Sequence, residues 1–278
     1  NSEIVLNEQA KTGFYSPQKS ATANSALIDG VHSLNGTKYG IYYKTNDRLV
    51  CTVTFDSKGE LSEVEYNSMV KPDKVWKTGD KGIELAEGDY YAKEIKSGRW
   101  FFVDGAIYEF AVTSENSYDM NFEDQPYNPQ IRTIATDADT GNHYMSYKDK
   151  VTIEDEVSYE DLIPDEEYTL TGILYNSTTG EIYTDPEGNT YTKSVKFTPD
   201  ASNSVIANGT ASGSVTVRFE DVLVPYEEIS IVVFESLYEE QNNVRIAFHE
   251  DISDADQTVI RRVPEIKTTA TDSNSGTH

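Results

Sequence analysis

Hydrophobic and polar residues alternate in short segments along most of the chain, and Gly-containing turns such as Lys58-Gly59 and Thr179-Gly180 separate them. The clearest segments are rich in β-branched and aromatic residues: 39–43, 49–55, 107–113, 168–174, 214–219 and 231–234. A period of two places successive side chains on opposite faces of a strand. Only 155–162 suggests a single helical turn. The pattern therefore predicts an all-β chain of antiparallel β-sandwich domains.

A segment from the middle of the chain recurs at its end. Residues 129–143 read PQIRTIATDADTGNH and residues 264–278 read PEIKTTATDSNSGTH, an offset of 135 (264 − 129). A domain-sized period is typical of an array of similar modules. We therefore expect a first module at 1–129, a different module at 130–262, and a linker with the first strand of the next repeat at 263–278.

Charge and composition exclude several classes of partner. The chain has 48 acidic and 23 basic residues and a net charge of −25, which would repel nucleic acid phosphates. Its single cysteine, Cys51, forms no intrachain disulfide. No stretch approaches the roughly 18–20 apolar residues of a membrane helix, and no signal peptide or anchor precedes the first module. We therefore expect an internal fragment of an exported protein, without membrane insertion.

Neither a metal nor a cofactor is expected. Residues 137–142 (DADTGN) share the spacing of a calcium loop, but the later acidic ligand is missing from the register. This arrangement favours a capped turn.

Three motifs in the first module resemble those of CnaB (SpaA-like) domains. They are SLNGTKYGIY at 33–42, LAEGDYYAKE at 85–94 and FEDQPYN at 122–128. In that family a strand lysine condenses with an Asn or Asp near the end of the domain, and a buried Glu catalyses the step. The resemblance implies an isopeptide bond to Asn128, with Glu94 as catalyst. It implies Lys19 as the donor, with Lys11 as the alternative.

The chemistry of such a bond depends on burial. An amine attacks an amide only when it is neutral, and burial favours the neutral forms of both amines and carboxyls. A protonated carboxyl can polarise the acceptor carbonyl and shuttle protons as the leaving group departs. The competing interpretation is that Glu94 and Lys93 are ordinary charges on a strand edge.

Two motifs in the second module resemble those of VaFE repeat domains, also called T-Q ester domains, which occur in Gram-positive surface adhesins. They are IVVFE at 231–235 and HEDISDADQT at 249–258, and weaker matches lie at 131–137, 155–162 and 168–172. In this family a first-strand threonine forms an ester with a last-strand glutamine, and ammonia leaves. The resemblance implies Gln257 as the acyl group and His249 as the proton carrier. Asp155 and Glu235 are the candidate acids: one would orient His249, and the other would polarise the Gln257 carbonyl.

The phase of the first strand selects the threonine. Ile131, Thr133 and Ala135 share one face, and Arg132 and Thr136 share the other. Because arginine belongs in water, the face with Thr133 is predicted to point inward.

The sequence therefore indicates a stalk segment of a Gram-positive, cell-wall-anchored surface adhesin. It would be a monomer, with adjacent repeat domains as partners. Its cross-linking would occur once per molecule, so it would not be an enzyme. One alternative is a module that binds a host protein or glycan through aromatics at Trp76 or Trp100. Another is a hydrolase that uses Thr133, His249 and Asp155 on outside substrates.

Overall fold

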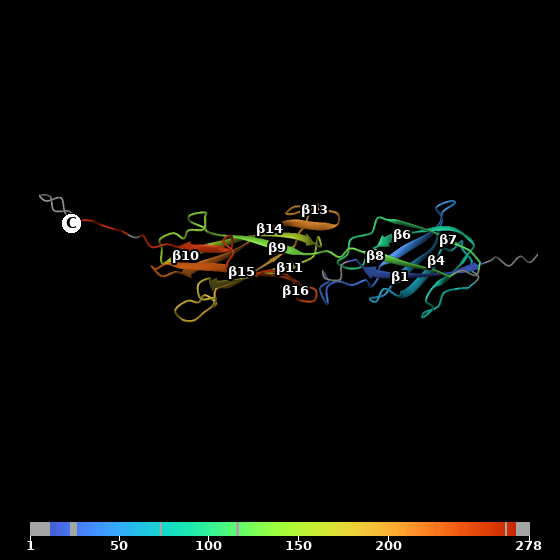
Figure 1. Ribbon diagram of the computed structural model, residues 1–278, viewed down its shortest axis with the longest axis horizontal. Coiled ribbons are helices and arrows are strands. Elements are labelled where there is room, and N and C mark those ends of the chain that lie inside the picture. The colour runs from blue at the N-terminus through green and yellow to red at the C-terminus, as the bar shows by residue number, and fades with distance from the viewer. Residues whose placement is uncertain (1–11, 23–26, 73, 115–116, 265, 271–278) are drawn as a thin grey trace, which may run out of the picture. The chain divides into compact units, whose positions relative to one another are not determined.

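The computed structural model describes residues 12–22, 27–72, 74–114, 117–264 and 266–270. The chain divides into two compact units, Asn1–Asn128 and Pro129–His278, one residue from the predicted boundary. Every regular element among the described residues is a β-strand (Figure 1). No helix in the part described is long and apolar enough to cross a membrane. The all-β prediction is confirmed.

The described residues of the first unit form two sheets. The larger has the order β4-β3-β2-β6-β7 and is antiparallel throughout: β4 (Leu61–Tyr66), β3 (Leu49–Phe55), β2 (Lys38–Tyr43), β6 (Gly88–Lys96) and β7 (Ile107–Val112). The smaller has the order β5-β1-β8: β5 (Ile83–Ala86), β1 (Thr12–Ala21) and β8 (Ser117–Asp124). Strands β1 and β8 pair in parallel, which departs from the purely antiparallel expectation. The first and last described strands of this unit therefore lie side by side.

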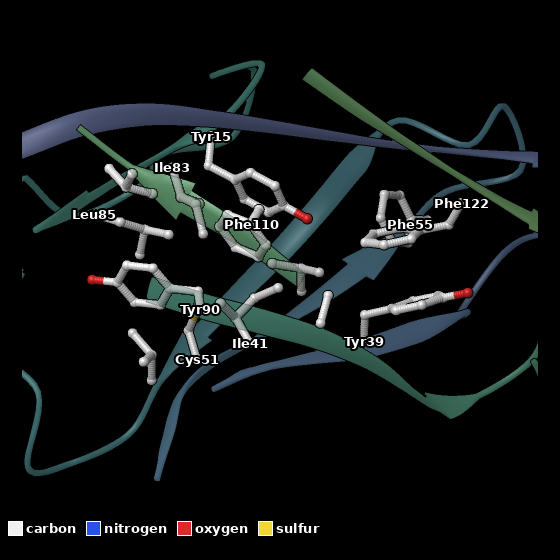
Figure 2. Close-up of a cluster of buried hydrophobic side chains, with 14 residues drawn as sticks. Tyr15, Tyr39, Ile41, Cys51, Phe55, Ile83, Leu85, Tyr90, Phe110 and Phe122 are labelled. Atoms are coloured by element: carbon white, nitrogen blue, oxygen red, sulfur yellow. The ribbon is translucent and has the colours of Figure 1, made fainter. Parts of the chain in front are cut away.

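The core of the first unit is built from the inward-facing side chains of both sheets (Figure 2). The rings of Tyr39 and Phe122 stack at 4.0 Å, and Phe55 packs edge-on against both. Strand β1 alternates, so Tyr15 and Lys19 point to the same buried side. The amphipathic pattern of β1 thus carries a lysine into an aromatic core.

The second unit is also a pair of sheets. One has the order β13-β14-β10-β9: β13 (Val205–Ala207), β14 (Thr210–Leu223), β10 (Lys150–Leu162) and β9 (Gln130–Asp137). The other has the order β12-β11-β15-β16, with β17 also paired to β15: β12 (Thr192–Phe197), β11 (Tyr168–Asn176), β15 (Ile229–Glu239), β16 (Val244–His249) and β17 (Thr258–Arg261). All the ladders are antiparallel.

One local prediction is wrong. Residues 155–162 form no helical turn but belong to β10, which pairs with β9 on one side and β14 on the other. Both neighbours supply backbone hydrogen bonds, and this pairing overrides local propensity. Residues 266–270 lie outside any strand in the described part of the chain. The first strand of a next repeat at 263–278 stays a prediction.

Candidate functional site

Lys19 lies in a buried cluster between β1, β8 and β6, which we call the lysine site. Its Nζ contacts Oδ1 of Asp124, and both side chains are fully buried. The same nitrogen donates a hydrogen bond of 3.0 Å to the hydroxyl of Tyr39. The Tyr39 ring centroid lies 5.0 Å from Nζ. The site therefore holds an amine against a carboxyl in a largely aromatic surrounding.

The predicted acceptor, Asn128, is not at this site. It is exposed and lies beyond the end of β8, whereas Asp124 is the last inward-facing residue of that strand. The parallel register pairs Lys19 with Phe122, so Lys19 lies close to the inward-facing Asp124. The geometry therefore favours Asp124 over Asn128 as the partner of Lys19. The alternative donor Lys11 lies outside the described residues.

Glu94 is buried beside this pair, as its predicted role requires. Burial raises the pKa of Glu94 to about 8, and a hydrogen bond from the Asp104 backbone N–H only partly opposes this. Burial also raises the pKa of Asp124, against the lowering effect of Lys19. The Glu94 and Asp124 side chains interact directly. Burial therefore favours the protonated form of Glu94, which can donate to Asp124.

The second cluster, the threonine site, lies where the loop before β17 meets β9. Thr133 faces inward as predicted and is 3% exposed, while Gln257 is completely buried. A backbone hydrogen bond of 2.7 Å from Ala135 N to Asp256 O joins β9 to this loop. The Gln257 side-chain N–H₂ donates to the carbonyls of Val233 (2.8 Å) and His249 (3.1 Å). The amide nitrogen is thus held, whereas Gln257 Oε1 and Thr133 Oγ1 have no conventional hydrogen-bond partner among the described residues.

Asp155 and Glu235 form a buried carboxyl pair at this site. Both are completely buried, and neither carboxyl has a hydrogen bond of conventional geometry among the described residues, although the Thr133 side chain lies near Asp155. Burial raises the pKa of Asp155 to about 6, which the Glu235 and Thr133 side chains only partly oppose. Burial, and then the neighbouring Asp155, raise the pKa of Glu235 well above its ordinary value. Burial and the neighbouring acid therefore favour protonation within this pair over two carboxylates.

His249 has a different acid partner from the one predicted. Its Nε2 lies 3.1 Å from Oδ2 of Asp254, and neither Asp155 nor Glu235 makes a conventional hydrogen bond to the ring. Asp155 and Glu235 pair with each other instead, and the loop after β16 folds back to bring Asp254 to the imidazole. With Nε2–H donating to Asp254, the buried and unpartnered Nδ1 is left with a free lone pair.

Residues 129–261 match the family model of the T-Q ester bond containing domain. This match covers most of the second unit, which we call the T-Q domain after it. The resemblance noted for this unit is thereby confirmed, and that of the first unit to CnaB domains stays a prediction. No curated protein matches the sequence.

Solved structures similar to this chain share only a coarse likeness. An adhesin from Mobiluncus mulieris with intramolecular disulfide, isopeptide and ester bond cross-links is 18% identical over 49% of this chain, with a TM-score of 0.39. The chain spans 57% of that protein's length. The major pilin subunit of Bacillus cereus is 14% identical, with a TM-score of 0.34, over 91% of this chain and 70% of its own. A β-glucuronidase of Bacteroides uniformis has a TM-score of 0.32, is 11% identical, and matches over 87% of this chain and 26% of its own. Likeness at this level does not distinguish adhesin from enzyme.

Two residues at these sites were not selected from the sequence. Asp254 of the T-Q domain belongs to the H-x-D-x-x-D-x-x-Q-T motif, so its signal was present five residues after His249 (254 − 249). Asp124 belongs to the motif that ends in Asn128, and the motif alone does not say which of the two faces inward. The described residues contain no group of three or more potential metal ligands. The Asp137 side chain instead accepts the N–H groups of Asp139 and Thr140, as in a capped turn.

Proposed function

We propose that this chain is a stalk segment of a Gram-positive surface adhesin in which each module is closed by a bond that it forms itself. The bonds are a Thr133–Gln257 ester and a Lys19–Asp124 isopeptide. One observation carries the proposal. In both modules a nucleophile and an acyl group from distant parts of the sequence are buried, beside a carboxyl whose pKa is raised. Lys19 contacts Asp124 directly, and the strand of Thr133 bonds to the loop of Gln257 through Ala135 N and Asp256 O.

The ester would form by acyl transfer within the T-Q domain. Thr133 Oγ1 attacks the side-chain carbonyl carbon of Gln257 while His249 Nδ1 takes its proton. The protonated carboxyl pair donates to Gln257 Oε1, where negative charge develops. The C–N bond then breaks, His249 returns the proton to the leaving nitrogen, and ammonia departs. Asp254 holds the imidazole in the required tautomer and stabilises its charged form.

The isopeptide would form by condensation with loss of water. Lys19 gives one proton to the Asp124 carboxylate, and its neutral Nζ then attacks the carboxyl carbon. Glu94 delivers a proton to the departing hydroxyl, which leaves as water, and regains a proton from the newly bonded nitrogen. An ammonium and a carboxylate thereby become an amide and one water. This bond differs from a lysine–asparagine bond, which would release ammonia.

The purpose of both bonds would be mechanical. Thr133 and Gln257 lie 124 residues apart in sequence (257 − 133), and Lys19 and Asp124 lie 105 apart. A bond between the first and last strands carries a pulling force past the rest of the fold. Such a bond also lowers the conformational entropy of the unfolded chain, as a disulfide does. This chain has only one cysteine and cannot form an intrachain disulfide.

The burial of Thr133 favours self-directed chemistry over turnover of outside substrates, so we do not propose an enzyme. The aromatic binding hypothesis has little support at Trp100, which is 1% exposed. Attachment to the cell wall and a monomeric state are parts of the same proposal.

The intact mass of the purified chain tests both bonds. Complete reaction leaves the mass short of the sequence mass by one ammonia and one water. Peptide mapping should recover Thr133 joined to Gln257 and Lys19 joined to Asp124. The full sequence mass, with all four side chains free, would overturn the proposal.

A further inference from the structure

Gly172 occupies an unexpected position in the T-Q domain. It faces inward in the middle of β11, between the buried Leu170 and Leu174, where a core side chain would be expected. Glycine weakens a strand interior and commonly marks a close approach of other atoms. The backbone does not require it, because Gly172 is not among the residues with positive φ. The reason for this glycine is therefore space.

That space is filled by the Glu235 carboxyl. Gly172 pairs directly with Glu235 on β15, and Glu235 pairs on its other side with His249 on β16. A Cβ on Gly172 would collide with Glu235 Oε1 and lie 3.0 Å from Glu235 Cδ. The carboxyl thus leans over β11, on the side away from His249.

The opposite sheet closes the same space. The added Cβ would lie 2.8 Å from Cζ of Phe219, whose ring comes from β14 and is only 4% exposed. Close-packed rings in a core move little, whereas a carboxyl at the end of a flexible side chain moves readily. A methyl group at position 172 would therefore displace Glu235 rather than Phe219.

We propose that Gly172 is a positioning residue for ester formation. The missing side chain gives the Glu235 carboxyl a place beside Asp155 and keeps it from pairing with His249. Displacement would separate the carboxyl pair and set Glu235 in competition with Asp254 for the imidazole. The role in ester formation rests on the proposed function, whereas the position of Glu235 does not.

The first test compares Gly172→Ala with Gly213→Ala. Gly213 is a strand glycine of β14 whose added Cβ would lie 2.6 Å from the Tyr159 hydroxyl, so this control perturbs packing without touching the carboxyl pair. Ester formation is followed by the loss of ammonia in newly synthesised protein. We expect Gly172→Ala to slow it at least about tenfold, as for a displaced catalytic group, and Gly213→Ala to react like the wild type. The proposal would be overturned if Gly172→Ala formed the ester as fast as the wild type, or if Gly172→Ala and Gly213→Ala slowed ester formation equally.

A second measurement is independent of the ester. In a Gln257→Leu background, which cannot react, the ¹³C signal of the Glu235 carboxyl is titrated with and without Gly172→Ala. We expect the alanine to move this titration to lower pH, because Glu235 leaves Asp155 and the dry space over β11. A titration that does not move would refute the positioning role. Wild-type protein that loses no ammonia would refute the ester alone, and the titration would still decide the role of Gly172.

Discussion

The ammonium nitrogen of Lys19 contacts a carboxylate oxygen of Asp124, and neither side chain has any exposure to water. The contact joins β1 to β8, which run in parallel. Removing two charges from water costs several kcal/mol per ion, and their attraction does not always repay it. Condensation to an amide would eliminate both charges. The geometry that is costly for an ion pair is therefore favourable for a covalent bond.

The acceptor can be identified by exchanging two residues. Asp124→Ala should retain the water that wild-type protein loses, whereas Asn128→Ala should lose it normally because Asn128 is exposed. Loss of a link across a loop of about 100 residues should lower the free energy of unfolding by about 4–5 kcal/mol in the chain-entropy model. Intact mass and thermal unfolding measure the two effects. An isopeptide that is missing from Asn128→Ala but present in Asp124→Ala would show that Asn128 is the acceptor, as the sequence predicted.

The leaving group supplies a separate check on Asp124. In Asp124→Asn the reaction would release ammonia in place of water, so the cross-linked variant should have the same mass as the cross-linked wild type. Its unreacted form differs in mass, which makes the two states separable in one spectrum. Conversion of this variant at Asn128 instead, seen by peptide mapping, would argue against the pairing.

Glu94 should act as an acid in isopeptide formation. Glu94→Gln keeps the shape but has no acidic proton, so the rate should fall by about 10²–10⁴-fold. Because burial raises the pKa of Glu94 to about 8, wild-type formation should slow as the pH rises through that value. Cell-free synthesis at pH values from about 6.5 to about 9, a range that brackets this pKa, followed by mass spectrometry measures both the effect of the substitution and the effect of pH on the rate. A rate independent of pH and of Glu94 would exclude acid catalysis by this residue.

His249 and Asp254 should act together in ester formation. His249→Ala should fold but retain the ammonia, with a rate about 10²–10⁴-fold lower because no base activates the hydroxyl. Asp254→Asn should also slow the reaction, since it no longer fixes the imidazole. Asp256→Asn is the matched control, because this acid of the same loop is exposed and bonds to β9 through its backbone oxygen, which the substitution keeps. A slow Asp256→Asn together with a normal Asp254→Asn would contradict the assignment.

The carboxyl pair should make the unreacted T-Q domain less stable at higher pH. In Gln257→Leu both acids stay free, and burial raises their pKa above the ordinary values of 3.8 and 4.5, to about 6 for Asp155. The folded state then binds more protons than the unfolded state. The contribution of this proton binding to the free energy of unfolding is complete below about pH 4 and is lost as the pH rises through about 6. The melting temperature should decrease as the pH is raised from about 4.5 to about 8, the interval over which the raised pKa values of these two acids change their protonation. The same variant with Asp155→Asn and Glu235→Gln should show a flatter profile.

Arg261 should stabilise the end of the T-Q domain without any covalent bond. It is completely buried and donates hydrogen bonds to backbone carbonyls in two loops: Ser146, Lys148, Val224 and Pro225. Arg261→Leu would leave these carbonyls without the donor, and we expect a loss of about 3 kcal/mol or more in a denaturant titration. Arg262→Leu, at the exposed neighbouring position, should change stability by less than about 0.5 kcal/mol.

The features that the sequence determined by itself are those with a local cause. Alternation located the strands, because a period of two is a property of a single chain segment. The same phase argument pointed Thr133 inward, and the structure places it there. The repeat of 129–143 at 264–278 placed the module boundary within one residue of the observed division. The motif ending in Gln257 identified the family of the second module.

Which side chains meet depends on how the strands pack and pair over long distances in sequence. The parallel register of β1 and β8 brings Asp124 rather than Asn128 to Lys19, and no local pattern encodes a register between strands about 100 residues apart. Asp155 and Glu235 come from different sheets, and burial makes them partners of each other. His249 is therefore left to Asp254, which reaches it only because the loop before β17 folds back. Pairing of this kind depends on long-range packing, which the local sequence pattern does not encode.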